Sequence, residues 1–231
     1  MSAAKGFFVT GTGTDVGKTV VAAVLAHDLR RQGSTVAVFK PAVTGLEEAS
    51  EPDHALLRRA AGSEQSDDEI APYRYGPPAS PHLAAAEAGE EIDPARLRQT
   101  ALAAGGGADV LVCEGVGGLL VPLTWRVESL VGGQRATYTV RDLAVDLGLP
   151  LVLAASPGLG TINQTLLTIE AARAAGLTVT AVVLTPWPKQ PSAIESSNRE
   201  TIEALGEVAV EVLPQLDLAT PKSWPGFSFS R

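Results

Sequence analysis

The chain has 231 residues, of which 45% are hydrophobic and 19% are charged, and its formal net charge is −8. This is the composition of an ordinary globular protein, with room for one large domain or two small ones. The negative balance argues against a nucleic acid or an anionic membrane as partner, because both need clustered Lys and Arg, whereas a small anionic ligand needs only a few local donors.

Apolar, β-rich runs alternate with helical patterns from the start of the chain. The predicted strands are residues 6–11, 35–40 and 109–115, and the predicted helices are 17–32, 53–61 and 94–104. Asp93 is a candidate N-cap of the last of these helices, with Pro94 at its first position. A polar, proline-containing stretch is expected over residues 62–82.

The same alternation continues through the second half. The predicted strands are residues 150–156, 177–185 and 207–214, and the predicted helices are 141–148, 161–175 and 192–205. Residues 124–140 contain Gly132-Gly133 and are expected to form a hairpin or a mobile loop. Residues 218–231 have two prolines and no periodicity, which predicts an irregular tail.

The buried strands are continuous Val, Leu and Ala runs, which is typical of a parallel sheet covered on both faces. The predicted fold is therefore α/β: a single doubly wound, mostly parallel sheet with helices on both faces. No internal repeat or linker divides the chain, so we expect one domain over residues 1–231.

Cys113 is the single cysteine, so no disulfide can form within the chain. The N-terminal residues lack the long apolar stretch of a signal peptide, and no run approaches the roughly 18–20 apolar residues of a membrane span. These observations predict a soluble cytoplasmic protein without a membrane partner.

The segment VTGTGTDVGKT (9–19) joins the first predicted strand to the first predicted helix. Strand, Gly-rich turn, Gly-Lys-Thr and helix is the phosphate-loop arrangement, in which backbone N–H groups converge on an anion. Lys18 would reach the terminal phosphates, and the Thr19 hydroxyl would bind Mg²⁺. The predicted sheet is therefore of the phosphate-loop NTPase type.

The spacing of the glycines departs from the usual motif. G-x-x-x-x-G-K-[ST] would place its first glycine at Thr12, but the glycine here is Gly11, one residue earlier. The alternative is a Gly-rich turn that only caps the helix. We favour the phosphate loop because Gly17, Lys18 and Thr19 stand where the mechanism needs them.

Three further charged residues are candidates for the same site. Lys40 ends the second strand in FKPAVTG (39–45), at the edge of the sheet where ligands bind, although a solvated lysine is the alternative. Glu114 ends a buried strand and could hold Mg²⁺, or could be an ordinary strand-ending residue. Asp53 opens a helix, where it could be only an N-cap.

Five segments together resemble dethiobiotin synthetases, in the family's order and spacing. They are residues 9–19, 39–45, SPHLAAAEAG (80–89), EGVGGLLVPL (114–123) and GLGTINQTLLTIEA (158–171). The resemblance spans roughly residues 6–185, and the family's loop also carries the extra residue between its glycines.

The resemblance implies an activity. The family uses ATP and CO₂ to form the ureido ring of dethiobiotin from 7,8-diaminononanoate (7,8-diaminopelargonate), in the penultimate step of biotin synthesis. One amine becomes a carbamate, the carbamate attacks the γ-phosphorus, and the second amine closes the ring on the mixed carbamic–phosphoric anhydride. The products are dethiobiotin, ADP and phosphate.

The resemblance also implies roles for individual residues, with Lys18 on the phosphates and Lys40 on the carbamate as the catalytic pair. The expected nucleotide-binding residues are Gly13, Thr14, Asp15, Val16, Gly17, Lys18, Thr19, Glu114, Pro186 and Trp187. The expected substrate-binding residues are Thr14, Lys40, Thr44, Ser80, Pro81, Gly118, Gly160, Thr161 and Asn163. The expected Mg²⁺ ligands are Thr19, Asp53 and Glu114. In the family the helix that receives the substrate's carboxylate belongs to the partner subunit, which implies a homodimer with shared active sites.

Some positions depart from the family pattern. Val116 stands where Ala is commoner, and Gln164 where His is common. In LTPWPKQP (184–191), Thr185-Pro186-Trp187 replaces an Asn-Asp pair whose Asn reads adenine. We therefore expect ATP or another nucleoside triphosphate as co-substrate, with weak discrimination among the bases.

Three other functions share the phosphate loop. A regulatory or partitioning ATPase usually carries a second lysine early in the loop, and none lies between Gly11 and Lys18. A guanine-nucleotide switch would show Asn-Lys-x-Asp, which is absent from the sequence. An amide-forming synthetase of the cobyrinic type would normally be part of a longer chain.

Overall fold

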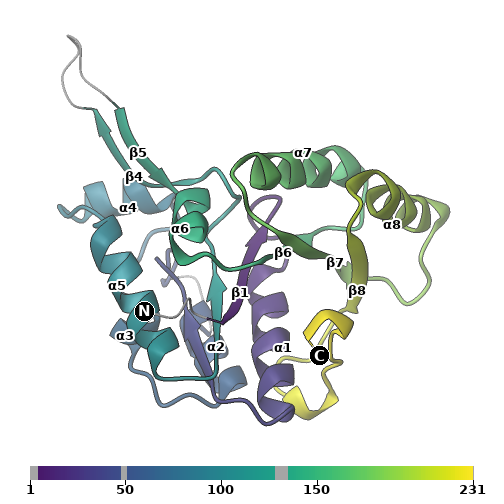
Figure 1. Cartoon of the computed structure of the whole chain (residues 1–231), viewed down its shortest axis with the longest axis horizontal. Helices are drawn as coiled ribbons and strands as arrows, with labels where there is room; N and C mark the ends of the chain where they lie inside the picture. Colours follow the sequence, from purple (N-terminus) through teal and green to yellow (C-terminus); the bar gives the residue numbers. More distant parts are fainter. Residues whose placement is uncertain (1–4, 48–50, 128–134, 231) are drawn as a thin grey trace.

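The structure is a computed structural model that describes residues 5–47, 51–127 and 135–230. Its first half contains β1 (Gly6–Gly11), α1 (Lys18–Arg31), β2 (Val36–Phe39), α2 (Asp53–Ala61), α3 (Asp67–Ile70), α4 (Pro81–Glu87), α5 (Pro94–Gly106) and β3 (Val110–Glu114). Its second half contains β4 (Pro122–Val127), β5 (Arg135–Thr139), α6 (Val140–Leu147), β6 (Leu151–Ala155), α7 (Thr161–Ala174), β7 (Val179–Trp187), α8 (Ala193–Gly206) and β8 (Ala209–Pro214). Figure 1 shows these elements.

Six strands form one sheet in the order β2-β3-β1-β6-β7-β8, and every pairing in it is parallel. All six carboxyl ends therefore lie along one edge. The strand order reverses on either side of β1, which is where α/β sheets of this kind bind ligands. The predicted doubly wound parallel sheet is confirmed.

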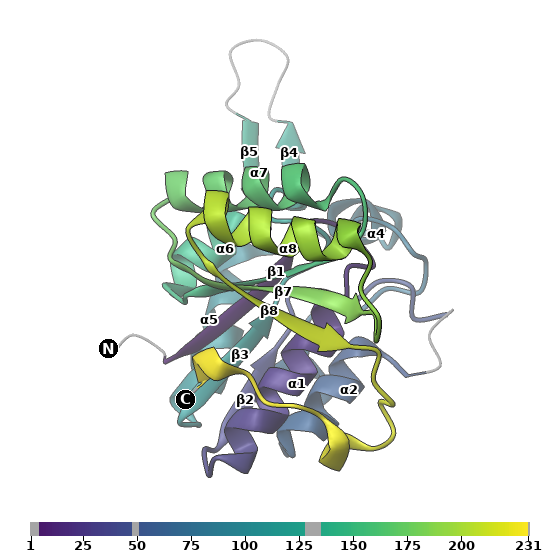
Figure 2. The same cartoon turned by 90° about the vertical axis from the view of Figure 1, so that its right-hand side faces the viewer.

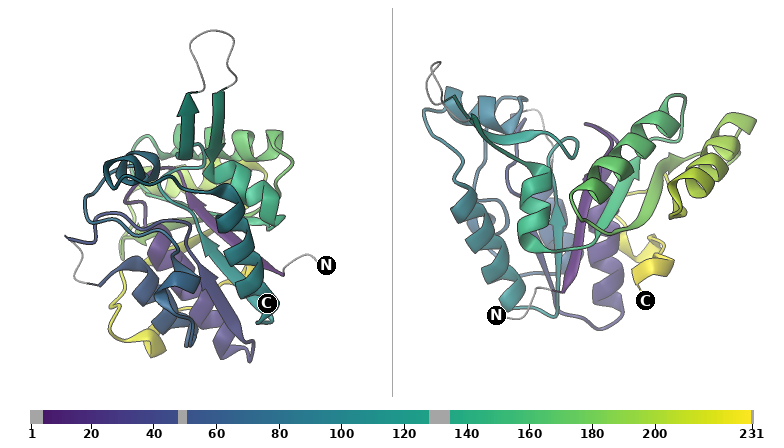
Figure 3. Two further views of the ribbon diagram at one scale, coloured as in Figure 1. Left: turned by 90° about the vertical axis from the view of Figure 1, so that its left-hand side faces the viewer. Right: turned by 45° about the horizontal axis from the view of Figure 1, so that its top comes forward.

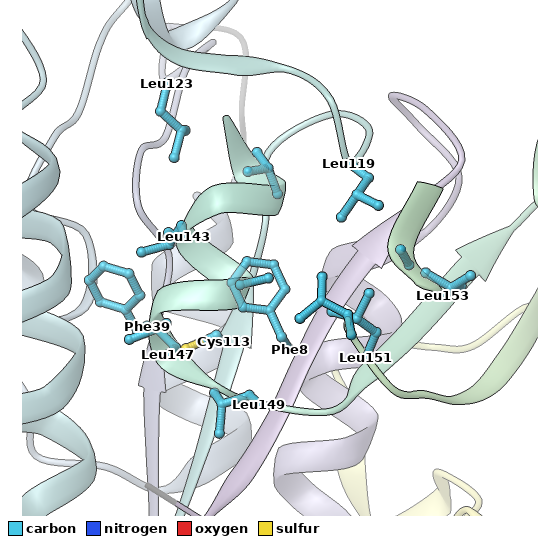
Figure 4. Packing of buried hydrophobic residues seen from close by; sticks show 14 of the residues in the cluster. Phe8, Phe39, Cys113, Leu119, Leu123, Leu143, Leu147, Leu149, Leu151 and Leu153 are labelled. Atoms are coloured by element: carbon cyan, nitrogen blue, oxygen red, sulfur yellow. The ribbon is translucent and has the colours of Figure 1, made fainter. Parts of the chain in front are cut away.

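Helices cover both faces of the sheet (Figure 3). Helices α1, α2 and α3 pack on one face with Val9, Val38 and Val112 of the strands. Helices α4 to α8 pack on the other face, where Leu143 and Leu147 of α6 belong to the same buried cluster as Phe8 (Figure 4). Alternate residues of β1 thus face opposite cores, which is why its apolar run is continuous.

The stretch over 62–82, expected only to be polar and to contain proline, includes α3 and the first two residues of α4, which were not predicted. Ser66 and Glu69 form a capping box that begins α3, and Pro81 begins α4 at the first helical position. A four-residue helix is too short for a periodic pattern to reveal, and its cap is the main signal. Asp93 caps α5 as predicted, because its side chain accepts from the Ala95 N–H.

Strands β4 and β5 pair antiparallel, as a hairpin predicts, and they project from the rest of the molecule (Figure 1). The connection between them, with Gly132-Gly133, lies outside the described residues. None of the helices in the described ranges has the length and hydropathy needed to cross a bilayer.

The tail has no α-helix or strand over 218–230, as expected, but it is not loosely attached. It makes two 3₁₀ turns, Pro221–Ser223 and Ser228–Ser230, and runs beside α1 (Figure 2). Trp224 and Phe227 are buried in the core that α1 shares with the sheet. Lack of periodicity predicted the absence of regular structure, but two buried aromatic rings fix the segment in place.

Candidate active site

The phosphate-loop segment leaves β1 at Gly11 and enters α1 at Lys18. Gly17 precedes the helix with φ of 84°, and a Cβ on it would lie 2.5 Å from Cγ2 of Thr185 in β7. Only glycine fits there, because L side chains rarely adopt this φ and the buried threonine leaves no room. Asp15 also has a positive φ, of 56°, which Asp tolerates better than most residues. Such a turn at a helix N-terminus gathers N–H groups into an anion-binding concavity.

Lys18 is only 7% exposed, and its Nζ donates a hydrogen bond of 2.7 Å to the carbonyl oxygen of Gly13. Its stem crosses Gly11, where an added Cβ would lie 2.9 Å from the lysine Cγ. Burial lowers the pKa of Lys18, and Glu114 opposes this shift. The ammonium group is therefore held inside the loop that is expected to surround the phosphates.

A cluster of four side chains lies beside this loop. Lys40 follows β2, Glu114 ends β3, Asp53 begins α2, and Thr19 is the second residue of α1. Lys40 Nζ donates to Glu114 Oε1 at 2.7 Å and also to Asp53 Oδ2, while Thr19 Oγ1 donates to the same Glu114 oxygen at 2.8 Å. Lys40 is 4% exposed and Glu114 is fully buried. One residue of the phosphate-loop segment, two strand-end residues and the first residue of α2 thus meet at one point.

The charges of this cluster depend on one another. Burial alone would lower the pKa of Lys40, but the Glu114 and Asp53 carboxylates outweigh it and raise this pKa. Burial raises the pKa of Glu114, and Asp53 adds to the effect while Lys40 opposes it. Burial would also raise the pKa of Asp53, but Lys40 lowers it below its usual value. With two carboxylates around one ammonium, we expect the proton to stay on Lys40.

One observation supports the predicted magnesium ligands. Glu114 Oε2 is buried and accepts no hydrogen bond from the residues that the structure describes, so it has a free acceptor beside Asp53 and Thr19. Buried carboxylate oxygens normally have a partner, and a bound cation would provide one here. The described ranges contain no group of three or more His, Cys, Asp or Glu able to hold a metal. Mg²⁺ binds through one or two carboxylates together with the phosphates of a substrate, and Glu114 and Asp53 provide two carboxylates beside the phosphate loop.

A cavity of about 370 Å³ opens at this point of the sheet edge. It is lined by Thr14, Asp15, Gly17, Lys18, Thr19, Val20, Lys40, Ala42, Thr44, Asp53, Glu114, Val116 and Gly117. It brings together both predicted catalytic lysines, the three predicted magnesium ligands and Thr44. A larger cavity of about 660 Å³ lies at the opposite end of the strands, beside Val36 and Ala108, and none of the predicted site residues lines it.

A second hollow of about 500 Å³ shares Gly13 and Thr14 with the phosphate loop. Gly118 lies in it, as do Leu120 and Leu167, whose side chains are exposed. Its walls are largely apolar, unlike the charged cavity beside it. The predicted substrate residues Thr14 and Gly118 therefore meet next to the lysines.

The remaining predicted substrate residues lie elsewhere. Ser80 and Pro81 begin α4, and Gly160, Thr161 and Asn163 begin α7. None of these five residues lines either hollow of this chain. The structure thus brings together the expected phosphate, metal and carbamate residues, but not the residues expected at the carboxylate end.

Pro186 and Trp187 end β7, and Trp187 is in register with Pro214 of β8. Neither lines the charged cavity. Thr185, noted in the sequence only because it stands in place of the Asn-Asp pair, packs on Gly17, a contact that no local pattern marks. Thr12, noted only for its spacing, has a buried hydroxyl without a partner among the described residues.

Comparisons with a family model and with curated proteins find matches over most of the chain. A family model described as an AAA domain matches residues 5–223. A protein of Aromatoleum aromaticum named ATP-dependent dethiobiotin synthetase BioD is 42% identical over 183 residues, which are 78% of this chain and 76% of that protein. Proteins of the same name from Rhodococcus erythropolis and Mycobacterium avium are 39% identical over 219 residues and 41% identical over 211 residues. These matches cover 92% and 89% of this chain and 86% and 85% of the relatives.

Solved structures share the fold at low identity. The signal recognition particle 54 kDa protein of Aeropyrum pernix K1, in complex with GDP, has a TM-score of 0.54 and 12% identity, over 99% of this chain and 45% of that one. The signal recognition particle receptor FtsY of Elizabethkingia anophelis has a TM-score of 0.51 and 14% identity, over 100% of this chain and 64% of that one. This chain thus spans less than two thirds of either protein, and the likeness concerns the fold alone.

Proposed function

This chain belongs to the family of ATP-dependent dethiobiotin synthetases, and we propose that the cavity between its phosphate loop and Lys40 is where it closes the ureido ring. The reaction is the ATP-dependent conversion of 7,8-diaminononanoate and CO₂ to dethiobiotin, ADP and phosphate in biotin biosynthesis. We take residues 1–231 as one synthetase domain.

One observation carries the assignment of the site: two buried lysines from different elements line a single cavity. Lys18 belongs to the phosphate loop and is common to NTPases of this shape. Lys40 comes from the end of β2, and a switch or partitioning ATPase has no evident use for a second buried ammonium there. A reaction that builds negative charge on two groups at once, a phosphoryl group and a carbamate, does have that use.

The proposed division of labour follows from these positions. Lys18 and the N–H groups of the loop bind the β- and γ-phosphates, and Lys40 holds the carbamate oxygen beside the γ-phosphorus. Mg²⁺, when bound to Thr19, Asp53 and Glu114, supplies positive charge to the phosphate oxygens. The side chains do little covalent chemistry, because phosphoryl transfer is accelerated mainly by positioning and by stabilising developing charge.

The diamine would lie along the loop. Thr14 and Thr44 are within the charged cavity, where their hydroxyls can bind an amine or its carbamate. The methylene chain would follow the apolar hollow past Gly118 and Leu120. Ser80 and Pro81 of α4 are proposed to contact the substrate from the other side.

The carboxylate end of the substrate is proposed to bind the first turn of α7 of a second subunit. Helix N-termini present unpaired N–H groups and a partial positive charge, which suit a carboxylate. Leu159, beside Gly160, is 94% exposed, and Leu120 and Leu167 are exposed as well. Exposed apolar side chains at α7 and in the apolar hollow support a homodimer with two shared sites. We propose a cytoplasmic location for this dimer.

The activity is tested by incubating the purified protein with 7,8-diaminononanoate, bicarbonate and Mg-ATP, with dethiobiotin detected by mass. The Lys40→Ala variant serves as the control for the site. Dethiobiotin from the wild type and none from the variant is the expected result. ATP hydrolysis without dethiobiotin would favour a regulatory ATPase instead.

A further inference from the structure

The loop between β6 and α7 is fixed from a distance by one side chain of α8. Asn198 is 6% exposed, and its Nδ2 donates to the carbonyl oxygens of Pro157 and Gly158 at 2.9 and 3.0 Å. Both amide protons are thereby used on consecutive carbonyls of the same loop. Ser156, Leu159 and Gly160 of this loop are exposed, so little core packing fixes its course.

The loop leads directly into the first turn of α7. The Gly158 carbonyl also accepts from the Thr161 N–H at 3.3 Å, so one oxygen joins Asn198 to the start of the helix. Gly160, at the N-cap, has φ of 90° and no side chain to cap the helix. The loop before the helix therefore helps to set where the N–H groups of the first turn lie, together with the packing of the buried residues of α7.

Asparagine is a poor choice for this position on stability grounds alone. Asn198 lies inside α8, a helix already begun by a capping box of Ser192 and Glu195. Asn has a low helix propensity, and burying an amide costs free energy unless its hydrogen bonds are made. Asn198 makes two such bonds to the loop, which an apolar residue could not make, and they are the physical reason for the amide.

We propose that Asn198 is a positioning residue for the carboxylate end of the diamine: it holds Pro157 and Gly158 so that the first turn of α7 meets the carboxylate. This rests on the proposed function, in which Gly160, Thr161 and Asn163 receive that group. Asn198 touches neither the lysines nor the phosphate loop, so it affects how the substrate's tail is bound and leaves the phosphate chemistry alone.

The test compares two diamines that differ only at the tail. One is 7,8-diaminononanoate, and the other is 2,3-diaminononane, in which a methyl group replaces the carboxylate. The quantity measured is the ratio of their kcat/KM values, which does not depend on how much of a preparation is folded. Asn198→Ala removes both donors without adding charge, and Asn198→Asp keeps the shape but places oxygen against both carbonyls.

In both variants the KM for the diamino acid should rise about tenfold, as expected for the loss of a favourable helix-terminus contact of roughly 1.4 kcal/mol. The KM for ATP and the rate with diaminononane should stay near wild type, so the preference for the carboxylate collapses. Glu200→Gln is the matched control, because it also exchanges a carboxylate oxygen and an amide nitrogen, but on an exposed residue of α8. It should leave the ratio of the two kcat/KM values unchanged.

An unchanged preference in both Asn198 variants, or an equal fall in kcat/KM for both diamines, would overturn the positioning role. Asn163→Ala separates this outcome from a failure of the proposed function. If Asn163→Ala abolishes the preference while the Asn198 variants keep it, the helix start binds the tail and only the positioning role is wrong. If the wild type itself shows no preference for the carboxylate, both assignments are wrong.

Discussion

Lys40 and Glu114 form an ion pair of 2.7 Å at the ends of two neighbouring strands, and both are almost completely removed from water. A buried ion pair contributes little net stability, because the desolvation of both charges offsets their attraction, but breaking it leaves one charge uncompensated. The pair is therefore better explained by the chemistry of the cavity than by folding. It also means that substitutions here need a stability control.

Replacing Lys40 should abolish synthesis and spare nucleotide binding. In Lys40→Met the stem is kept but the ammonium is lost, so the carbamate has no positive partner while the phosphate loop is intact. Dethiobiotin formation should fall by several orders of magnitude, and calorimetric titration with Mg-free nucleotide should give a near-normal Kd. The uncompensated Glu114 should lower stability by about 3–5 kcal/mol, measured by urea unfolding. An equal loss of nucleotide affinity in Lys40→Met and Lys18→Ala would make Lys40 another phosphate contact.

Lys18→Ala should cut turnover by orders of magnitude and leave the fold intact. Its Nζ has one hydrogen bond in the structure, to a loop carbonyl, so the fold loses little when it is removed. The terminal phosphates, in contrast, lose the charge that the transition state needs most. Steady-state rates and circular dichroism check the two halves of this prediction. A folded variant with a near-normal rate would contradict the phosphate-loop assignment.

The end of β7 predicts weak discrimination among nucleoside triphosphates. A site built to hydrogen-bond one base rejects others strongly, because its buried polar groups are left unpaired. Thr185, Pro186 and Trp187 offer no amide side chain for this purpose. Rates with ATP, CTP, GTP and UTP should therefore lie close together. A preference for ATP above about a hundredfold, roughly 2.7 kcal/mol, would show the expectation wrong.

The sequence predicted the parts of this site that depend on local order. Lys18, Lys40 and Glu114 each follow or end a predicted strand, and parallel strands bring their carboxyl ends to one edge. The sequence alone could not show that Lys40 lies between Asp53 and Glu114, because that contact joins three elements whose pairing was unknown.

The contacts that were missed join residues far apart in the chain. Asn198 reaches back to Gly158, and Thr185 packs on Gly17. Nothing in the sequence around Asn198 or Thr185 indicates which distant residue it contacts. The tail shows the same limit. Its irregular course was predicted, but not the burial of Trp224 against α1, which depends on where the chain returns after β8.

The tail should make stability sensitive to acid through Asp28. This α1 carboxylate is buried and accepts hydrogen bonds from the Phe227 N–H at 3.1 Å and from Ser230 Oγ at 2.7 Å. Burial alone would raise the pKa of Asp28, but Ser230, Arg31 and Phe227 outweigh it and lower this pKa. The stability that the Asp28 carboxylate contributes is therefore fully present at a pH above its pKa in the unfolded chain. It is lost as the pH falls through the lower pKa of Asp28 in the folded protein. In urea unfolding from pH 7 to pH 2, Asp28→Asn should be less stable than wild type at pH 7, by about 1–3 kcal/mol, and the gap should narrow in acid. A difference in unfolding free energy between Asp28→Asn and wild type that stays constant from pH 7 to pH 2 would contradict this role of Asp28.

Subunit mixing should restore activity if the sites are shared. Lys18→Ala removes the phosphate lysine and should be nearly inactive alone. Asn163→Ala alters the helix start that is proposed to serve the partner, and should be about tenfold less active alone when the diamine is kept well below its KM. A mixed dimer then has one site with both lesions and one site with neither. Random exchange at equal concentrations makes half of the dimers mixed, each with one intact site of two, so activity should return to about a quarter of wild type. Exchange is confirmed separately with two affinity tags on the subunits. Mixed dimers without recovered activity would mean that each subunit binds the carboxylate with its own α7.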